Sequence, residues 1–137
     1  MSYALLKKMN KKKILIIEDD EILSKTLRDF LSADGFEVII ASNGEIGIKM
    51  AKEKCPDLIV LDIILPKKDG YEVIKELKKR SGNARNIPIV LLTNLGSFAD
   101  VEKALRLGAT TYLTKTDYSL EDIAKKIKET LNANTRK

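Results

Sequence analysis

The stretch Leu58-Ile59-Val60-Leu61-Asp62 decides how this chain folds. A run of apolar residues, two of them β-branched, favours a short strand buried on both faces, as the central strands of parallel sheets are. The strand ends in a carboxylate, and functional groups gather at the carboxyl ends of strands in open α/β sheets. Pro66 and the pair Asp69-Gly70 then indicate a loop. We therefore expect Asp62 to lie at a functional site.

Apolar runs alternate with helical patterns along the rest of the chain. The runs predict strands over residues 14–17, 36–40, 58–61, 87–92 and 111–114. Helical spacing of apolar residues follows each run, over about residues 22–34, 45–55, 71–77, 98–107 and 119–131. Short connections between strands and helices predict a parallel sheet covered by helices on both faces. The expected fold is a three-layer α/β (βα)5 arrangement with the flavodoxin-like strand order 2-1-3-4-5.

Length, composition and charge limit the classes of protein to which the chain can belong. The 137 residues suit one domain, and 44% hydrophobic with 33% charged residues is typical of a globular protein. A net charge of +5 has two interpretations: lysines on solvated faces, which we favour, or a basic surface for a partner. Cys55 has no second cysteine to pair with, which predicts a cytoplasmic protein, and no histidine to activate it.

Acidic residues end two strands that should be neighbours. Glu18-Asp19-Asp20 follows the first strand and Asp62 ends the third, and the switch point of the predicted order lies between them. Oxygen ligands without histidine favour a hard cation, and Mg²⁺ is the abundant one. The alternative is that the acidic triplet caps the following helix, whose N-terminus favours negative charge.

Thr93 and Lys115 close the fourth and fifth predicted strands. A hydroxyl donor and an ammonium beside carboxylates and a cation form a site for a tetrahedral dianion attached to one carboxylate. Each residue has a structural alternative, as a turn-forming threonine or a solvated lysine. Their joint placement at strand ends favours the phosphoryl site.

With these residues at its strand ends, the chain resembles the receiver domain of two-component response regulators, which is CheY-like in form. The resemblance covers about residues 13 to 132, which leaves residues 1–12 as an N-terminal extension and 133–137 as a C-terminal tail. Met9 is an alternative start of the domain. The matching pieces are residues 14–19, Leu61-Asp62, Pro66, Asp69-Gly70, residues 91–93, residues 107–109 and residues 112–115.

The resemblance implies a role for each matching residue. Asp62 would accept a phosphoryl group from a histidine kinase or a phosphotransfer protein. Asp19, Asp62 and the backbone carbonyl of Ile64 would bind Mg²⁺, with Glu18 acting through water. Thr93 and Lys115 would contact the phosphoryl oxygens, and Tyr112 would turn inward on activation unless it only packs at a strand edge. The family register favours the acidic pair Glu18/Asp19 over Asp19/Asp20.

The chain departs from the family pattern at three positions. Thr116 follows the lysine where the family usually has proline, often after a cis bond; without proline that bond costs about 2.5 to 4 kcal/mol, so a trans bond is an alternative. Asn94 replaces the usual alanine and either shields the site or donates to the phosphate. Ile64 and Leu95, at the mouth of the site, cannot orient water, which predicts slow loss of the phosphoryl group.

The leading function is a stand-alone phosphorylation switch that changes the surface formed by the fourth helix, fifth strand and fifth helix for an unidentified protein target. We expect no direct DNA binding, no membrane association, no enzymatic turnover beyond its own phosphorylation and dephosphorylation, and a monomer or phosphorylation-dependent dimer. One alternative is a receiver-like interaction module that never carries phosphate. Another is an Mg²⁺-dependent phosphatase, but such an enzyme would need a general acid at position 64, and Ile64 cannot donate a proton.

Overall fold

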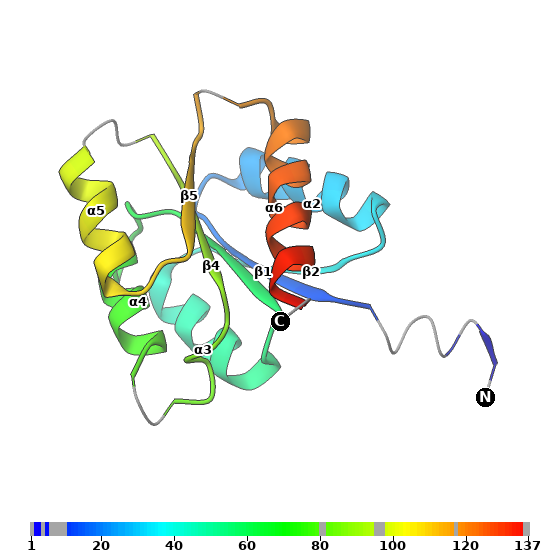
Figure 1. Cartoon of the computed structure of the whole chain (residues 1–137), viewed down its shortest axis with the longest axis horizontal. Coiled ribbons are helices and arrows are strands. Elements are labelled where there is room, and N and C mark those ends of the chain that lie inside the picture. The colour runs from blue at the N-terminus through cyan, green and yellow to red at the C-terminus, as the bar shows by residue number, and fades with distance from the viewer. Residues whose placement is uncertain are drawn as a thin grey trace.

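Figure 1 shows the computed structural model of the chain, which describes residues 11–79, 82–94, 98–116 and 118–135, together with Ser2, Tyr3 and Leu5. Most of the predicted N-terminal extension and the end of the predicted tail lie outside the described residues. The domain limits 13–132 therefore stay a prediction.

Five strands form one parallel sheet in the order β2-β1-β3-β4-β5, which confirms the predicted order. The strands are β1 (Lys13–Ile17), β2 (Glu37–Ala41), β3 (Leu58–Leu61), β4 (Ile89–Thr93) and β5 (Thr111–Thr114). The three strands at the centre, β1, β3 and β4, are buried along almost their whole length, because helices cover both faces of the sheet. This burial explains why their sequences are apolar without alternation.

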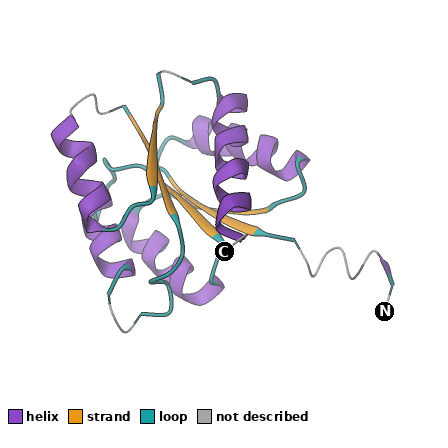
Figure 2. Ribbon diagram, viewed as in Figure 1, coloured by secondary structure: helices purple, strands orange, loops and turns teal. Residues whose placement is uncertain are grey.

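Helices lie on both faces of the sheet, as Figure 2 shows. They are α2 (Glu21–Ala33), α3 (Gly44–Lys54), α4 (Gly70–Leu77), α5 (Phe98–Leu107) and α6 (Leu120–Thr135). One core joins α3, α4 and α5 to the side chains of Leu15, Ile59 and Leu91. The other joins α2 and α6 to the alternate strand residues, such as Ile16 and Val60. The three predicted layers are confirmed.

Two strands begin later than the sequence predicts. Phe36 is not in β2, because its amide donates to the carbonyl of Leu31 and completes the end of α2. Gly35, with φ of 93°, provides the left-handed turn that ends the helix. Strand β4 begins at Ile89 rather than Ile87, since Pro88 has no amide hydrogen to donate to a neighbouring strand.

Helix α5 is attached to the rest of the molecule by few groups. Its buried residues are Val101 and Ala104. The hydroxyl of Tyr71, in α4, donates to the backbone carbonyl of Asp100 at 3.1 Å. The ammonium of Lys103 lies 4.3 Å from the centre of the same ring, within range of a cation–π interaction. One aromatic side chain of α4 thus holds the first turns of α5.

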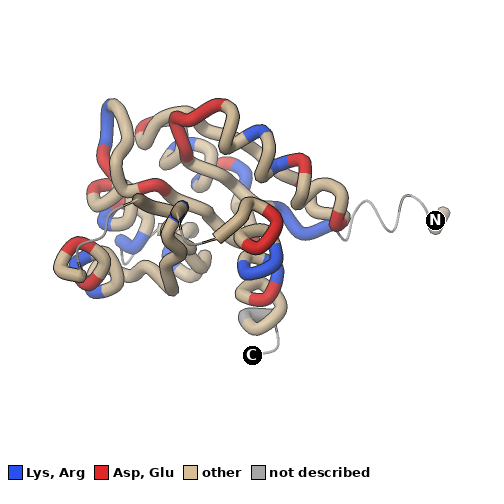
Figure 3. Tube along the Cα trace, turned by 90° about the horizontal axis from the view of Figure 1, so that it is seen from above, with Lys and Arg blue, Asp and Glu red and all other residues tan. Residues whose placement is uncertain are grey.

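Basic and acidic residues are interspersed along the chain, as Figure 3 shows. Several lysines and arginines pair with carboxylates on the surface, including Lys25 with Glu21 and Lys52 with Glu76. These pairs balance charges locally on the surface, and the location of the excess positive charge stays a prediction. Of the helices in the described ranges, none combines the length and apolar character needed to cross a membrane.

Candidate functional site

The carboxyl ends of the central strands meet because backbone hydrogen bonds fix their register. The amide of Asp62 donates to the carbonyl of Ile17 at 3.1 Å, so the end of β3 lies beside the end of β1. The amide of Lys115 donates to the carbonyl of Thr93 at 2.9 Å, which sets the end of β5 beside the end of β4. The residues that follow these strands are therefore brought to one edge of the sheet.

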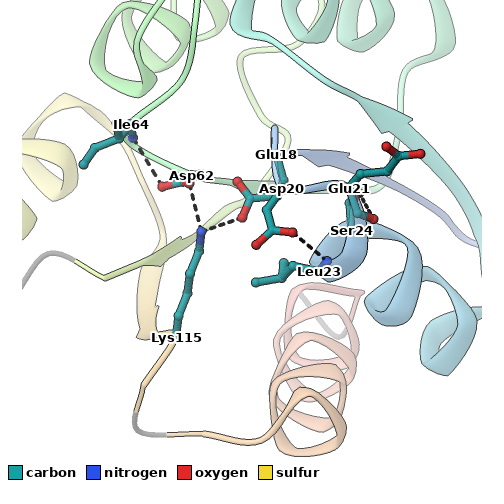
Figure 4. A network of polar contacts seen from close by, with 8 residues as sticks. All are labelled: Glu18, Asp20, Glu21, Leu23, Ser24, Asp62, Ile64 and Lys115. Carbon is teal, nitrogen blue, oxygen red and sulfur yellow. Dashed lines mark hydrogen bonds and ion pairs between the residues drawn. The ribbon is translucent and has the colours of Figure 1, made fainter.

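Lys115 joins the two acidic strand ends. Its ammonium donates to Asp62 Oδ2 at 2.9 Å and to Glu18 Oε1 at 2.5 Å. The other oxygen of Asp62, Oδ1, accepts from the amide of Ile64 at 3.2 Å. Figure 4 shows the lysine side chain reaching up between the two carboxylates. The sequence predicted that Asp62 and Lys115 would meet, but it did not predict the contact between Lys115 and Glu18.

The three residues of the acidic triplet do different things. Asp20 is the N-cap of α2, and its Oδ1 accepts from the amide of Leu23 at 3.1 Å. Its side chain points toward the helix in Figure 4. Glu18 and Asp19 instead lie with Asp62, and carboxylate oxygens of the three are all within 4.8 Å of one another. This geometry supports the register Glu18/Asp19, and capping accounts for Asp20 alone.

Burial controls the charge of Glu18. Its side chain is only 3% exposed, and burial together with the neighbouring Asp62 carboxylate raises its pKa from 4.5 to about 8, although the Lys115 ammonium opposes this. For Lys115, burial lowers the pKa, but the hydrogen bonds and charges of Glu18 and Asp62 outweigh burial and leave the pKa raised. The lysine is therefore a stable positive charge, and without a bound cation Glu18 takes up a proton more readily than an ordinary carboxylate.

The acidic group has the features of a site for a hard cation. Its donors are all carboxylate oxygens, which Mg²⁺ prefers. The oxygens lie within 4.8 Å of one another, slightly more than the roughly 4.2 Å that separates opposite ligands around Mg²⁺, each about 2.1 Å from the ion, so small side-chain movements would bring them to coordination distance. In addition, Glu18 Oε2 is buried and has no hydrogen-bond partner among the described residues, so it has an unmet need for a cation or a donor. The residues present therefore fit Mg²⁺.

The remaining predicted residues lie around this group. Thr93 is fully buried at the end of β4. Tyr112 is 44% exposed on β5, the edge strand, so its inward turn stays a prediction. Ile64 is 64% exposed, and Asn94 is exposed beside Thr93. Leu95 lies outside the described residues.

The peptide bond after Lys115 is trans, since none of the bonds between described residues is cis. Thr116 therefore occupies the usual proline position without the cis geometry that the family often has there. Of the two alternatives left open by the sequence, the trans bond is the one observed.

Comparison with known proteins points to one family. The family model described as "Response regulator receiver domain" matches residues 14–128. The "Probable transcriptional regulator ycf27" of Cyanophora paradoxa is 40% identical over 123 residues, which are 90% of this chain and 49% of that protein. The "Alkaline phosphatase synthesis transcriptional regulatory protein PhoP" of Bacillus subtilis is 40% identical over 88% of this chain and 48% of its own length. The chain thus spans about half the length of these curated relatives.

Solved structures agree with the family model. A "response regulator receiver domain protein (CheY-like)" from Methanospirillum hungatei superposes with a TM-score of 0.83 at 27% identity, covering 93% of this chain and 98% of the other. A "two-component response regulator" from Clostridium difficile has a TM-score of 0.80 at 33% identity, with coverage of 89% and 97%. Together with the strand order and the match to residues 14–128, these likenesses show that the chain belongs to the response regulator receiver domain family.

Proposed function

We propose that Asp62 accepts a phosphoryl group from a phosphohistidine of a histidine kinase or a phosphotransfer protein. The observation that carries the proposal is the convergence on one carboxylate of the Lys115 ammonium, the Ile64 amide and the Glu18/Asp19 pair. Asp62 is 7% exposed, so it is largely shielded from bulk solvent. Such an arrangement suits phosphoryl transfer, which needs positioning and charge neutralisation rather than covalent help from the protein.

The transfer requires one bond to form and one to break. An oxygen of the Asp62 carboxylate attacks phosphorus in line with the leaving imidazole; the phosphorus–nitrogen bond breaks, and its electron pair stays on the imidazole. Lys115, already at the carboxylate, offsets the negative charge of the phosphoryl oxygens, and the Thr93 hydroxyl donates to one of them. Mg²⁺, when held by Glu18, Asp19, Asp62 and the Ile64 carbonyl, supplies further positive charge to the transferred group.

The phosphoryl group then changes the protein surface. Movement of Thr93 toward the phosphoryl oxygens vacates space that Tyr112 fills by turning inward, and this shifts the surface formed by α5, β5 and α6. The modified carboxylate is a product that persists, so the protein acts as a switch and not as an enzyme. Because the chain spans about half of its curated relatives, the proposal is limited to phosphoryl acceptance and the surface change.

A direct experiment tests the acceptor. The protein is incubated with Mg²⁺ and acetyl phosphate, and its intact mass is measured. The expected result is a base-labile gain of one phosphoryl group, which is lost in Asp62→Asn and kept in Asp29→Asn, a change of an exposed acid on α2. A steady release of phosphate without an adduct would instead indicate a phosphatase, and no adduct with no release would indicate a passive interaction module.

The phosphorylated form is expected to be long-lived. Hydrolysis needs a water held in line with the acyl phosphate bond, and the exposed side chain at the mouth, Ile64, cannot hydrogen-bond to water. The adduct should therefore persist for hours or longer after acetyl phosphate is removed, as measured by intact mass over time. Ile64→Gln should shorten its lifetime several-fold. Loss of the wild-type adduct within minutes would contradict this prediction.

A further inference from the structure

The loop that follows Asp62 is held in one conformation by tertiary contacts. It runs from Ile63 to Asp69, and Asp69 caps α4 by accepting from the amide of Glu72 at 3.0 Å. Within it, Lys67 has φ of 73°, in the left-handed region that side chains other than glycine rarely adopt. A tight turn closes around Lys67, because the amide of Lys68 donates to the carbonyl of Pro66 at 2.9 Å. Two glycines lie in close contact with the loop on either side of this turn.

Gly70 places the start of α4 directly against the end of β3. Its amide donates to the carbonyl of Ile63 at 2.6 Å. A Cβ at position 70 would lie 2.5 Å from Ile63 Cα and 2.8 Å from the carbonyl oxygen of Asp62. These neighbours are backbone atoms, which cannot turn aside as the end of a side chain can. Any side chain at this position must therefore push the backbone of Asp62 and Ile63 away.

Gly44 supports the same loop from α3. A Cβ there would lie 2.1 Å from the carbonyl oxygen of Lys68 and 2.9 Å from Val73 Cγ2. Asn43, the N-cap of α3, fixes this first turn by accepting from the amide of Ile46 at 2.9 Å. The loop after Asp62 thus lies between the N-termini of α3 and α4. Each helix can contact the backbone of this segment because its contacting residue is a glycine, Gly44 in α3 and Gly70 in α4.

We infer that Gly44 and Gly70 are positioning residues for phosphoryl acceptance, acting through the backbone that carries Asp62 and Ile64. The inference rests on the proposed function of Asp62. The Asp62 carboxylate accepts a hydrogen bond from the Ile64 amide, and Ile63 links these two residues in the chain. A displacement of this backbone changes the position of the Asp62 oxygens relative to Asp19 and Lys115. The absence of two side chains therefore sets the geometry of the acidic site.

The test compares glycine variants that differ in what they touch. Gly70→Ala and Gly44→Ala are expected to weaken Mg²⁺ binding at least tenfold by calorimetry, and to slow labelling by acetyl phosphate at saturating Mg²⁺ at least tenfold. Gly108→Ala is the matched control. Gly108 has φ of 123° and would place a Cβ 2.8 Å from Lys78 Cγ, so this change also strains the fold, but it lies at the opposite edge of the sheet.

The outcomes separate positioning from loss of stability. If Gly108→Ala lowers the melting temperature as much as the two other variants but keeps Mg²⁺ affinity and labelling rate within twofold of the wild type, the inference stands. If affinity and rate fall in proportion to stability in all three variants, or remain unchanged in Gly70→Ala and Gly44→Ala, it is overturned. Failure of the wild type to label at Asp62 would overturn the proposed function, while Mg²⁺ affinity would still test the positioning of the loop.

A measurement on the unmodified protein covers the case in which the variants do not fold. The Gly70 amide is expected to exchange its hydrogen slowly, because it donates to Ile63 within a closed backbone contact. Its NMR signal should also shift when Mg²⁺ is added. Exchange as fast as that of a solvent-exposed loop amide, without a Mg²⁺-dependent shift, would overturn the inference.

Discussion

Replacement of Lys115 by alanine is expected to have the largest effect on the Mg²⁺-free protein, lowering its free energy of unfolding by about 3 kcal/mol at pH 9. The ammonium contacts both Glu18 and Asp62, and the lysine side chain is only 13% exposed. Without it, buried carboxylates lose their counter-charge and must be ionised without compensation or take up a proton. Chemical denaturation in the presence of EDTA measures this loss.

The pH dependence of the Lys115 effect follows from the shifted pKa values. The pKa of Lys115 is raised above 10.5, so its stabilising contribution is fully present below pH 10.5 and is lost as the pH rises through the folded-state value. In Lys115→Ala, Glu18 no longer has the ammonium that lowers its pKa, so it retains a proton to higher pH. The loss of stability should therefore be smaller at pH 6 than at pH 9.

A surface lysine provides the control for this prediction. Lys25 also pairs with a glutamate at 2.5 Å, but both side chains are largely exposed. Lys25→Ala should therefore lower the free energy of unfolding by less than about 1 kcal/mol. Equal losses of stability in Lys25→Ala and Lys115→Ala would show that the buried lysine is not the counter-charge of the site.

Lys115→Ala should also slow the labelling of Asp62 by acetyl phosphate about 100-fold, because the variant lacks a charged group directed at the phosphoryl oxygens.

Mg²⁺ affinity is expected to rise with pH, by up to about tenfold per unit between pH 6 and 8, and to level off above pH 8. The cause is Glu18, whose pKa is raised to about 8 and which must lose its proton before it can contribute a negative charge. Because this folded-state pKa exceeds the ordinary value of 4.5, the contribution of Glu18 to stability without Mg²⁺ is present below pH 4.5 and is lost as the pH rises through 8.

Calorimetry in buffers of different ionisation enthalpy measures both the affinity and the proton released. Near pH 7 we expect release of close to one proton for each Mg²⁺ bound. Glu18→Gln is the matched variant: it keeps the shape of the side chain but has no proton to lose, so the slope of affinity with pH should disappear. Equal wild-type affinities at pH 6 and pH 9 would contradict the prediction.

The sequence predicts the fold because the central strands are buried on both faces. Leu58 to Leu61 are all apolar, whereas a strand with one face in solvent would alternate apolar and polar residues. The predicted strand order then brings Asp62 beside the end of β1, as the structure confirms. The predicted starts of β2 and β4 were wrong by one and two residues. Phe36 completes the end of α2 instead of starting β2, and Pro88 has no amide hydrogen with which to pair to a neighbouring strand.

The details of the site depend on tertiary contacts that local patterns do not encode. The sequence favours the pair Glu18/Asp19 only through the family register, and the structure separates Asp20 from this pair by its capping hydrogen bond to the amide of Leu23. The contact of Lys115 with Glu18 joins residues 97 positions apart. In the sequence, Gly44 has no feature that distinguishes it from an ordinary turn glycine. Its importance follows from the packing of α3 against the loop after Asp62, which only the structure shows.

The attachment of α5 through Tyr71 lies at the same edge of the sheet as the acidic group, because α4 follows Asp62 and α5 follows Thr93. Tyr71 directly follows Gly70, the residue in backbone contact with Ile63, and its hydroxyl and ring hold the first turns of α5. The Tyr71 contacts and the buried residues Val101 and Ala104 therefore couple the position of α5 to that of its neighbours. A single phenol ring thus connects the helix that begins after Asp62 to the helix that begins after Thr93.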